Sequence, residues 1–372
     1  MNSNVSGSRG EFAVRALKGL YESYGYSQYK MSKFEEYELY VRNKSFLVSD
    51  HIITFTDAHG SLMALKPDVT LSIVKNSPER EVGVRKVYYN ENVYRVPKGA
   101  LSFKEIMQAG LECIGEIDKY SVAEVLTLAI KSLEAISSNY VLDVSHMGII
   151  SAVVDEMGFS ARGRESLISC IGEKNIHGID TLCVSEGKDI SCADTLKRLI
   201  AMKGSADEML EILKGSSCYD DALETSEILS ALSGNVRIDF SVTDDMSYYC
   251  GIVFKGFVKG IPTSVLSGGR YDRLMQRMGK DSGAIGFAVY LDLLGELEES
   301  GCEYDGDVFL IYDDSTDISK LLSVTSELVA SGKTVKTGRN APERSKYRET
   351  VDMRGGSDNG NAKRCSPKGS TW

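Results

Sequence analysis

The chain has 372 residues, of which 42% are hydrophobic and 26% charged, and its formal net charge is −10. This composition is ordinary for a globular protein with room for one large and one smaller domain, and the acidic balance disfavours a broad nucleic-acid surface, which needs clustered positive charge. No apolar run approaches the ~20 residues that span a bilayer, and residues 1–12 lack the apolar core of an export signal. We therefore expect a cytoplasmic protein without a membrane partner.

The thiol and imidazole side chains give no sign of a metal site. The eight cysteines occur singly, without a CxxC pair, and in a chain without an export signal they are expected to be reduced thiols. The four histidines, His51, His59, His146 and His177, show no HxxxH or HExxH spacing. We expect neither a metal nor a cofactor.

The first part of the chain predicts helices alternating with paired strands. Apolar residues recur at helical spacing over 11–24, before Gly25. A hairpin is predicted over 52–65, and Pro67 is expected to open a short helix. The elements predicted next are strands over 84–96 and 103–116, a helix over 121–137 and a strand over 140–146.

The pattern from residue 159 to 232 is mostly helical, and strands are predicted again afterwards. The strands are expected over 235–242, 248–258 and 261–269, and the apolar residues 284–299 are interpreted as a glycine-containing helix. Strands joined by hairpins or helical excursions favour an α+β fold with an antiparallel sheet. The expected domains are a core over 1–300 with a helical insertion at about 159–232, a short α/β segment over 305–338 and a polar, disordered tail over 339–372.

Three residues of the strand at 103–116 suggest a binding site. Gln108, Gly110 and Glu112 alternate, so they share one face of the strand. A solvated face is the simplest explanation, but a glycine inside a strand often marks the close approach of a ligand or another backbone. A carboxylate beside an amide suits an ammonium group. With Asp68 as a second acceptor and Tyr249 as a ring wall, the pattern suggests a pocket for the α-amino group of an amino acid.

Six segments together resemble the catalytic core of histidyl-tRNA synthetase, and they occur in that family's order between residues 11 and 295. The segments are 55–70, 84–95, 103–116, 248–254, 267–274 and 284–291. The resemblance implies a class II synthetase-like antiparallel sheet flanked by helices. It also implies that histidine is held by Asp68, Thr70, Gln108, Glu112, Tyr249 and Tyr271, with Arg95 and Tyr248 as further pocket candidates.

The chain departs from the synthetase pattern where ATP is handled. Asp244 and Leu293 stand at two positions where the synthetases have arginine, and Pro97 replaces an acidic residue. Adenylate formation needs positive groups to offset phosphate charge, and removing one preorganised charge donor typically costs ~2.7–4 kcal/mol of transition-state stabilisation. The resemblance therefore predicts a retained histidine pocket without ATP chemistry and no catalytic residues.

A synthetase-like chain of this kind resembles the regulatory subunits of ATP phosphoribosyltransferase, the first enzyme of histidine biosynthesis. That family implies a non-catalytic subunit that forms a homodimer by itself and a hetero-octamer with a short catalytic subunit, and that is required for activity and for feedback inhibition by histidine. Two alternatives stay open: an active histidyl-tRNA synthetase, and a synthetase-derived histidine sensor or scaffold. A catalytic phosphoribosyltransferase is disfavoured, because we find no pyrophosphate-binding loop.

Overall fold

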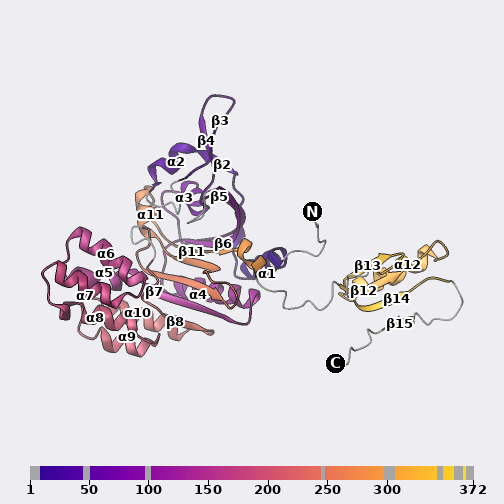
Figure 1. Cartoon of the computed structure of the whole chain (residues 1–372). Coiled ribbons are helices and arrows are strands. Elements are labelled where there is room, and N and C mark those ends of the chain that lie inside the picture. The colour runs from indigo at the N-terminus through magenta and orange to yellow at the C-terminus, as the bar shows by residue number, and fades with distance from the viewer. Residues whose placement is uncertain are drawn as a thin grey trace. The chain divides into compact units, whose positions relative to one another are not determined.

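The structure is a computed structural model, and it describes residues 9–44, 51–96, 102–243, 248–296, 306–341, 347–355 and 363–365. The chain divides into two compact units, residues 7–297 and residues 298–372 with the first six residues. Figure 1 shows the helices and strands of both units. Within the described residues, no helix is both long and apolar enough to cross a membrane.

An eight-stranded sheet forms the centre of the larger unit. Its strands lie in the order β1 (Ser27–Gln28), β5 (Val84–Arg95), β6 (Lys104–Gly115), β11 (Gly283–Tyr290), β10 (Leu266–Arg270), β9 (Ile252–Val258), β7 (Tyr140–His146) and β8 (Val236–Ile238). Only the edge pairs β1/β5 and β7/β8 are parallel. The predicted antiparallel α+β architecture is confirmed.

Both faces of this sheet are covered by helices. On one face, α1 (Arg9–Ser23) and α4 (Lys119–Ile136) pack on side chains that include Leu111 and Cys113 of β6. On the other face, α3 (Thr70–Lys75) and α11 (Asp272–Arg277) pack with Ile106 and Ile114 of the same strand. Because successive side chains of a strand point to opposite faces, Gln108 and Glu112 lie on the second face, inside the protein.

A small three-stranded sheet packs on that second face through Ala64 of its central strand. It has the order β2 (Phe34–Glu36), β4 (Leu62–Leu65) and β3 (Thr54–Thr56), and α2 (Tyr37–Arg42) follows β2. The predicted hairpin is therefore present as β3 and β4, and Asp57 Oδ1 accepts hydrogen bonds from the backbone of its turn. The helix expected to open at Pro67 begins three residues later, at Thr70 of α3.

The helices of the insertion lie together (Figure 1), and their core also includes Val253 of β9. Its elements are α5 (Met147–Glu156), α6 (Ala161–Gly172), α7 (Ile176–Ser185), the 3-10 helix η2 (Ile190–Ala193), α8 (Asp194–Ala201), α9 (Ala206–Ile212) and α10 (Tyr219–Ser230). Leu167, Ile179 and Leu196 are fully buried in this core. The side chains of Ser160 and Asn175 cap α6 and α7 by accepting a hydrogen bond from a backbone N–H of the first turn.

The helix predicted over residues 284–299 is wrong. Residues Gly283–Tyr290 form β11, and Leu291–Glu296 form the 3-10 helix η3. β11 pairs with β6 on one side and β10 on the other, and both of its faces are buried, because Ile285 and Phe287 lie in one core and Ala284 in the other. An apolar run buried on both faces cannot be told from a buried helix by its periodicity alone.

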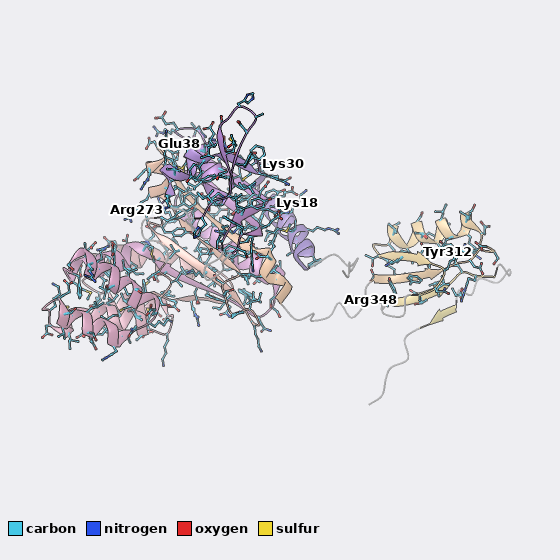
Figure 2. All side chains as sticks on the ribbon, turned by 45° about the horizontal axis from the view of Figure 1, so that its top comes forward. Lys18, Lys30, Glu38, Arg273, Tyr312 and Arg348 are labelled. Carbon is cyan, nitrogen blue, oxygen red and sulfur yellow. The ribbon has the colours of Figure 1, made fainter. Side chains whose placement is uncertain are left out.

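The smaller unit is an α/β unit. Its sheet has the order β13 (Val335–Gly338), β12 (Gly306–Ile311), β14 (Tyr347–Asp352) and β15 (Lys363–Cys365), and α12 (Ile318–Ala330) packs on it. Figure 2 labels Tyr312, which follows β12, and Arg348, which lies on β14. The disorder expected over 339–372 is therefore wrong for β14 and β15. Val351 of β14 is buried against Val308 and Leu310 of β12, and this small apolar contact holds β14 in the sheet.

Candidate functional site

The candidate site lies on the second face of the sheet, where β6 and β11 run side by side. Glu112 of β6 is directly opposite Gly286 of β11, and Gln108 is directly opposite Tyr290. α3 and α11 close this face from above, because their apolar residues pack with Ile106 and Ile114 in the same core. The site therefore has a strand floor and helix ends as walls.

Glu112 is the centre of a hydrogen-bond network. Its side chain is only 2% exposed. Thr70, at the start of α3, donates a hydrogen bond from Oγ1 to Glu112 Oε1 at 2.7 Å, and Tyr271, just before α11, donates from its hydroxyl to Oε2 at 2.6 Å. Three of the six predicted histidine-binding residues thus meet in one cluster.

The charge state of Glu112 follows from this burial. Loss of solvation raises its pKa from the ordinary 4.5 to about 8, although the Tyr271 and Thr70 hydrogen bonds act in the opposite direction. Burial also keeps the pKa of Tyr271 well above its ordinary value, so its hydroxyl remains a donor. Glu112 is therefore largely neutral near pH 7, and a cation beside it would stabilise the carboxylate.

Two glycines make room for the network. A side chain at Gly286 would collide with Glu112 Oε2 and with the Leu111 carbonyl oxygen. A side chain at Gly110 would collide with the Phe287 carbonyl oxygen and the Tyr89 hydroxyl. The close approach predicted at Gly110 is therefore made by the protein's own groups rather than by a ligand. Sequence reasoning missed both Gly286 and Tyr89 as site residues.

Asp68 lies beside this network, in the turn before α3. Its Oδ1 accepts a hydrogen bond from the backbone N–H of Leu71 at 2.9 Å. Burial raises the Asp68 pKa, and that hydrogen bond together with the nearby Arg95 charge lowers it again in part. Asp68 also raises the Glu112 pKa by repulsion. A cation near both groups would favour the ionised form of each.

Three tyrosines form an aromatic wall. The ring centroids of Tyr248 and Tyr249 are 4.6 Å apart, and those of Tyr248 and Tyr271 are 5.8 Å apart. The Tyr249 ring lies so close to Gly269 of β10 that a side chain there would collide with it. The two glycines before Arg270 therefore lie in β10, and Gly269 leaves room for the Tyr249 ring.

Gln108 and Arg95 complete the set of predicted residues. Both side chains are buried, Gln108 in the middle of β6 and Arg95 at the end of β5. Among the residues that the structure describes, neither makes a side-chain hydrogen bond or ion pair. A buried polar group normally has a partner, so the Gln108 amide and the Arg95 guanidinium, which make no hydrogen bond to the described residues, are candidates to contact a ligand.

The positions that depart from the synthetase pattern are only partly described. Asp244 and Pro97 lie outside the described residues. Leu293 lies in η3, and its side chain packs against the core on the opposite side of the sheet from Glu112. Tyr290 is opposite Gln108, and its hydroxyl is 2.6 Å from Ser267 Oγ. The buried carboxyl groups, hydroxyls and rings suit a small cationic and polar molecule, and Leu293 carries no charge that could offset a phosphate.

The raised pKa of Glu112 makes stability depend on pH. This group favours folding below its ordinary pKa of 4.5, and that contribution is lost as the pH rises through about 8. Glu112→Gln cannot ionise, so its stability relative to the wild type should increase from about pH 5 to about pH 9. One pKa unit corresponds to about 1.4 kcal/mol, so the change should reach a few kcal/mol. Urea unfolding across this range checks it, and a pH-independent difference would contradict it.

The sequence matches a known family over most of its length. The family model for histidyl-tRNA synthetase matches residues 8–294. An ATP phosphoribosyltransferase regulatory subunit of Clostridium kluyveri is 30% identical over 311 residues, which cover 77% of each chain. A histidine–tRNA ligase of Methanococcus vannielii is 26% identical over 294 residues, covering 75% of this chain and 69% of the ligase.

Solved structures agree in fold. A chain of the ATP phosphoribosyl transferase (HisG:HisZ) complex of Thermotoga maritima has a TM-score of 0.59 and 19% identity, covering 75% of this chain and 96% of that one. The sheet, the insertion and the glutamate-centred site define a class II synthetase-like protein of the histidyl-tRNA synthetase family. Within it, the chain belongs to the ATP phosphoribosyltransferase regulatory subunits.

Proposed function

We propose that this chain is a non-catalytic subunit that acts on a short catalytic subunit of ATP phosphoribosyltransferase, which needs it for activity, and that histidine inhibits the complex by binding at the Glu112 site. The single observation that carries the histidine part is the buried Glu112 carboxyl group held between the Thr70 and Tyr271 hydroxyls. Family membership supports the partner and the pathway.

The geometry supports an account of how histidine is held. The α-ammonium group would pair with Glu112 and Asp68 and donate a hydrogen bond to the amide oxygen of Gln108. The Gln108 side chain has no other hydrogen-bond partner among the described residues. The buried Arg95 guanidinium would pair with the α-carboxylate of histidine. Its charge already lowers the pKa of Asp68. The aromatic wall of Tyr248, Tyr249 and Tyr271 would pack against the imidazole ring.

Binding in this account is linked to a proton. Near neutral pH Glu112 is largely protonated, because its pKa is about 8. An ammonium ion favours the ionised carboxylate, so histidine binding releases a proton from Glu112. The Thr70 and Tyr271 hydroxyls keep the carboxyl group in one orientation in both states. Between about pH 6 and pH 8, affinity for histidine is then expected to rise with pH.

The proposed assembly follows the family. The chain is proposed to form a homodimer by itself and a hetero-octamer with four catalytic subunits in the cytoplasm. The Thermotoga maritima structure, named a HisG:HisZ complex, supports a partnership with a catalytic subunit for chains of this fold. A histidine–tRNA ligase is also among the relatives, so synthetase activity of this chain is the alternative to test.

The absence of synthetase activity can be tested directly. We expect the purified chain to show no histidine-dependent exchange of pyrophosphate into ATP above background. The physical reason is that Leu293, where the synthetases have arginine, is a partly buried apolar side chain that packs against the core and cannot offset phosphate charge. Exchange is measured beside an authentic histidyl-tRNA synthetase as the positive control. A rate comparable with that control would favour the synthetase alternative.

A further inference from the structure

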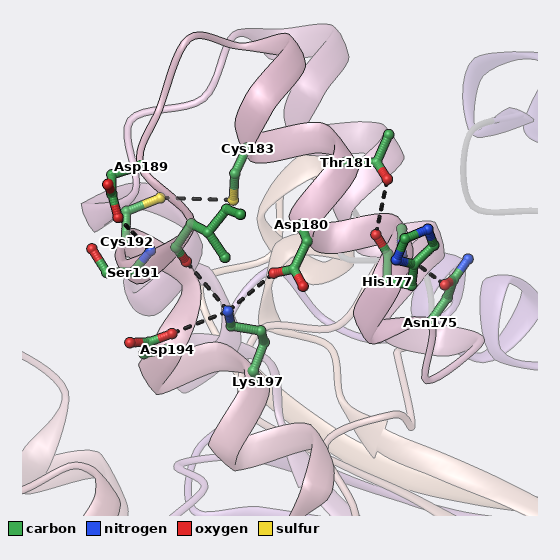
Figure 3. Close-up of polar contacts among 12 residues, drawn as sticks. Asn175, His177, Asp180, Thr181, Cys183, Asp189, Ser191, Cys192, Asp194 and Lys197 are labelled. Carbon is green, nitrogen blue, oxygen red and sulfur yellow. Dashed lines mark hydrogen bonds and ion pairs between the residues drawn. The ribbon is translucent and has the colours of Figure 1, made fainter.

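Two cysteines meet at the surface of the helical insertion, far from the Glu112 site in sequence. Cys183 lies near the end of α7 and Cys192 lies in η2, and their sulfur atoms are 3.8 Å apart (Figure 3). Cys183 is fully buried, whereas Cys192 is exposed to solvent. The Cys192 thiol is therefore accessible to reagents, whereas the Cys183 thiol is buried beneath it.

The surrounding contacts hold the two thiols together. Lys197 of α8 donates from Nζ to Asp180 of α7 and to Asp194, both at 3.0 Å, and to the carbonyl oxygen of Ile190 in η2 at 3.3 Å (Figure 3). This one ammonium group thus ties together the three elements around the pair. The fixed arrangement argues that the short sulfur–sulfur distance is a lasting feature of the fold.

The chain between the cysteines is a tight turn. The backbone N–H of Lys188 donates to the Cys183 carbonyl oxygen at 2.9 Å, and Gly187 has a φ of 68°. Asp189 then caps η2 by accepting a hydrogen bond from the Ser191 N–H at 2.8 Å. The turn brings Cys192 back over the end of α7 within nine residues of Cys183.

We propose that Cys183 and Cys192 form a redox-active dithiol, which closes to a reversible disulfide by exchange with a small-molecule disulfide such as oxidised glutathione. Within the described part of the chain, no group of three or more His, Cys, Asp or Glu side chains could hold a metal ion, so a metal site does not explain the pair. Disulfides in the cytosol are usually transient and redox-sensing, and a pair held in contact suits such a role.

The exchange proceeds in two balanced steps. The Cys192 thiolate attacks one sulfur of the small disulfide, so a mixed disulfide forms and one thiolate leaves. Cys183 then loses its proton and attacks Cys192 Sγ, which forms the protein disulfide and releases the second thiolate. The two protons lost by the cysteines end on the two released thiols. The sulfur atoms move from 3.8 Å to a bond of about 2.05 Å.

The order of these steps follows from burial. Loss of solvation raises the pKa of the Cys183 thiol to about 11, with a further contribution from its contact with Cys192, while the nearby Lys197 charge lowers it in part. A thiol that stays protonated is a poor first nucleophile. Cys192 therefore reacts first with the external disulfide, and Cys183 resolves the mixed disulfide from inside.

Peptide mapping of the whole chain tests the proposal, because Lys188 lies between the two cysteines. The folded protein is equilibrated with reduced or oxidised glutathione, its free thiols are alkylated under denaturing conditions, and it is digested with trypsin. The oxidised sample should yield residues 175–188 linked to residues 189–197, and this linked pair should disappear after reduction. In the reduced sample the two peptides should be alkylated and separate.

Two serine variants separate a dithiol from two independent thiols. Cys183→Ser should stop at a stable glutathione adduct on Cys192, and this adduct should be much scarcer in the wild type because Cys183 removes it. Cys192→Ser should leave Cys183 reduced, and this variant changes only an exposed side chain. The proposal is overturned if the wild-type chain accumulates the Cys192 adduct as fully as Cys183→Ser does, or if both wild-type thiols remain alkylatable in oxidised glutathione.

Discussion

Replacing Glu112 with alanine is expected to raise the histidine concentration for half-inhibition of the reconstituted complex by roughly tenfold or more. The substitution removes the buried carboxyl group that the Thr70 and Tyr271 hydroxyls hold in place. A charge-assisted hydrogen bond contributes ~1.5–3 kcal/mol, and each 1.4 kcal/mol corresponds to about tenfold in affinity. Tyr249→Ala is expected to weaken histidine inhibition in the same direction, because it removes one ring of the aromatic wall.

The matched control for this experiment is Glu116→Ala. Glu116 lies one residue beyond β6, is exposed, and makes no side-chain hydrogen bond or ion pair among the described residues. Its loss should leave both assembly and half-inhibition unchanged. If Glu112→Ala still assembles with the catalytic subunit and is inhibited at the wild-type histidine concentration, the pocket is an inherited feature and histidine is sensed elsewhere.

Gly286→Ala is expected to disrupt the same site from the neighbouring strand. The added Cβ would meet the Glu112 carboxylate and the Leu111 carbonyl oxygen, and a backbone atom in the middle of a sheet cannot move away easily. Overpacking a core typically costs ~1–3 kcal/mol. We therefore expect a lower midpoint of urea unfolding together with weaker histidine inhibition in the protein that remains folded.

A second glycine of the same region serves as the control for crowding. Gly295 lies in η3, and a Cβ there would meet nothing within 4 Å. Gly295→Ala should leave both the unfolding midpoint and the histidine response close to the wild type. Equal stability of the Gly286 and Gly295 variants would show that the sheet relaxes around the extra carbon, which would contradict the tight contact between Glu112 and β11.

Part of the fold follows from local pattern alone. The β5 and β6 strands, twelve residues each, are predicted without the structure because two strand-like segments flank a short polar loop. The apolar run of β11 is continuous and therefore also fits a helix, although its small residues Ala284, Gly286 and Ala288 alternate with Ile285, Phe287 and Val289. That period-two alternation of size is the signal that indicates a strand buried on both faces.

The residues of the site could be predicted from the sequence, but their arrangement could not. Thr70, Glu112 and Tyr271 are far apart in the sequence, and only the family resemblance placed them together. Their hydrogen bonds depend on the register of β6 against β11 and on where α3 and α11 begin. Neither the register nor the helix starts can be derived from propensities of single residues. The roles of Gly286 and Tyr89 follow from the same register, which is why sequence reasoning missed them.

The most direct test of the regulatory role is the activity of the short catalytic subunit with and without this chain. We predict low ATP phosphoribosyltransferase activity for the catalytic subunit alone, a large increase when the wild-type chain is added, and loss of that increase when histidine is added. Sedimentation of the mixture should show a complex larger than either protein alone. A catalytic subunit that is equally active without this chain, or that does not sediment with it, would contradict the proposed function.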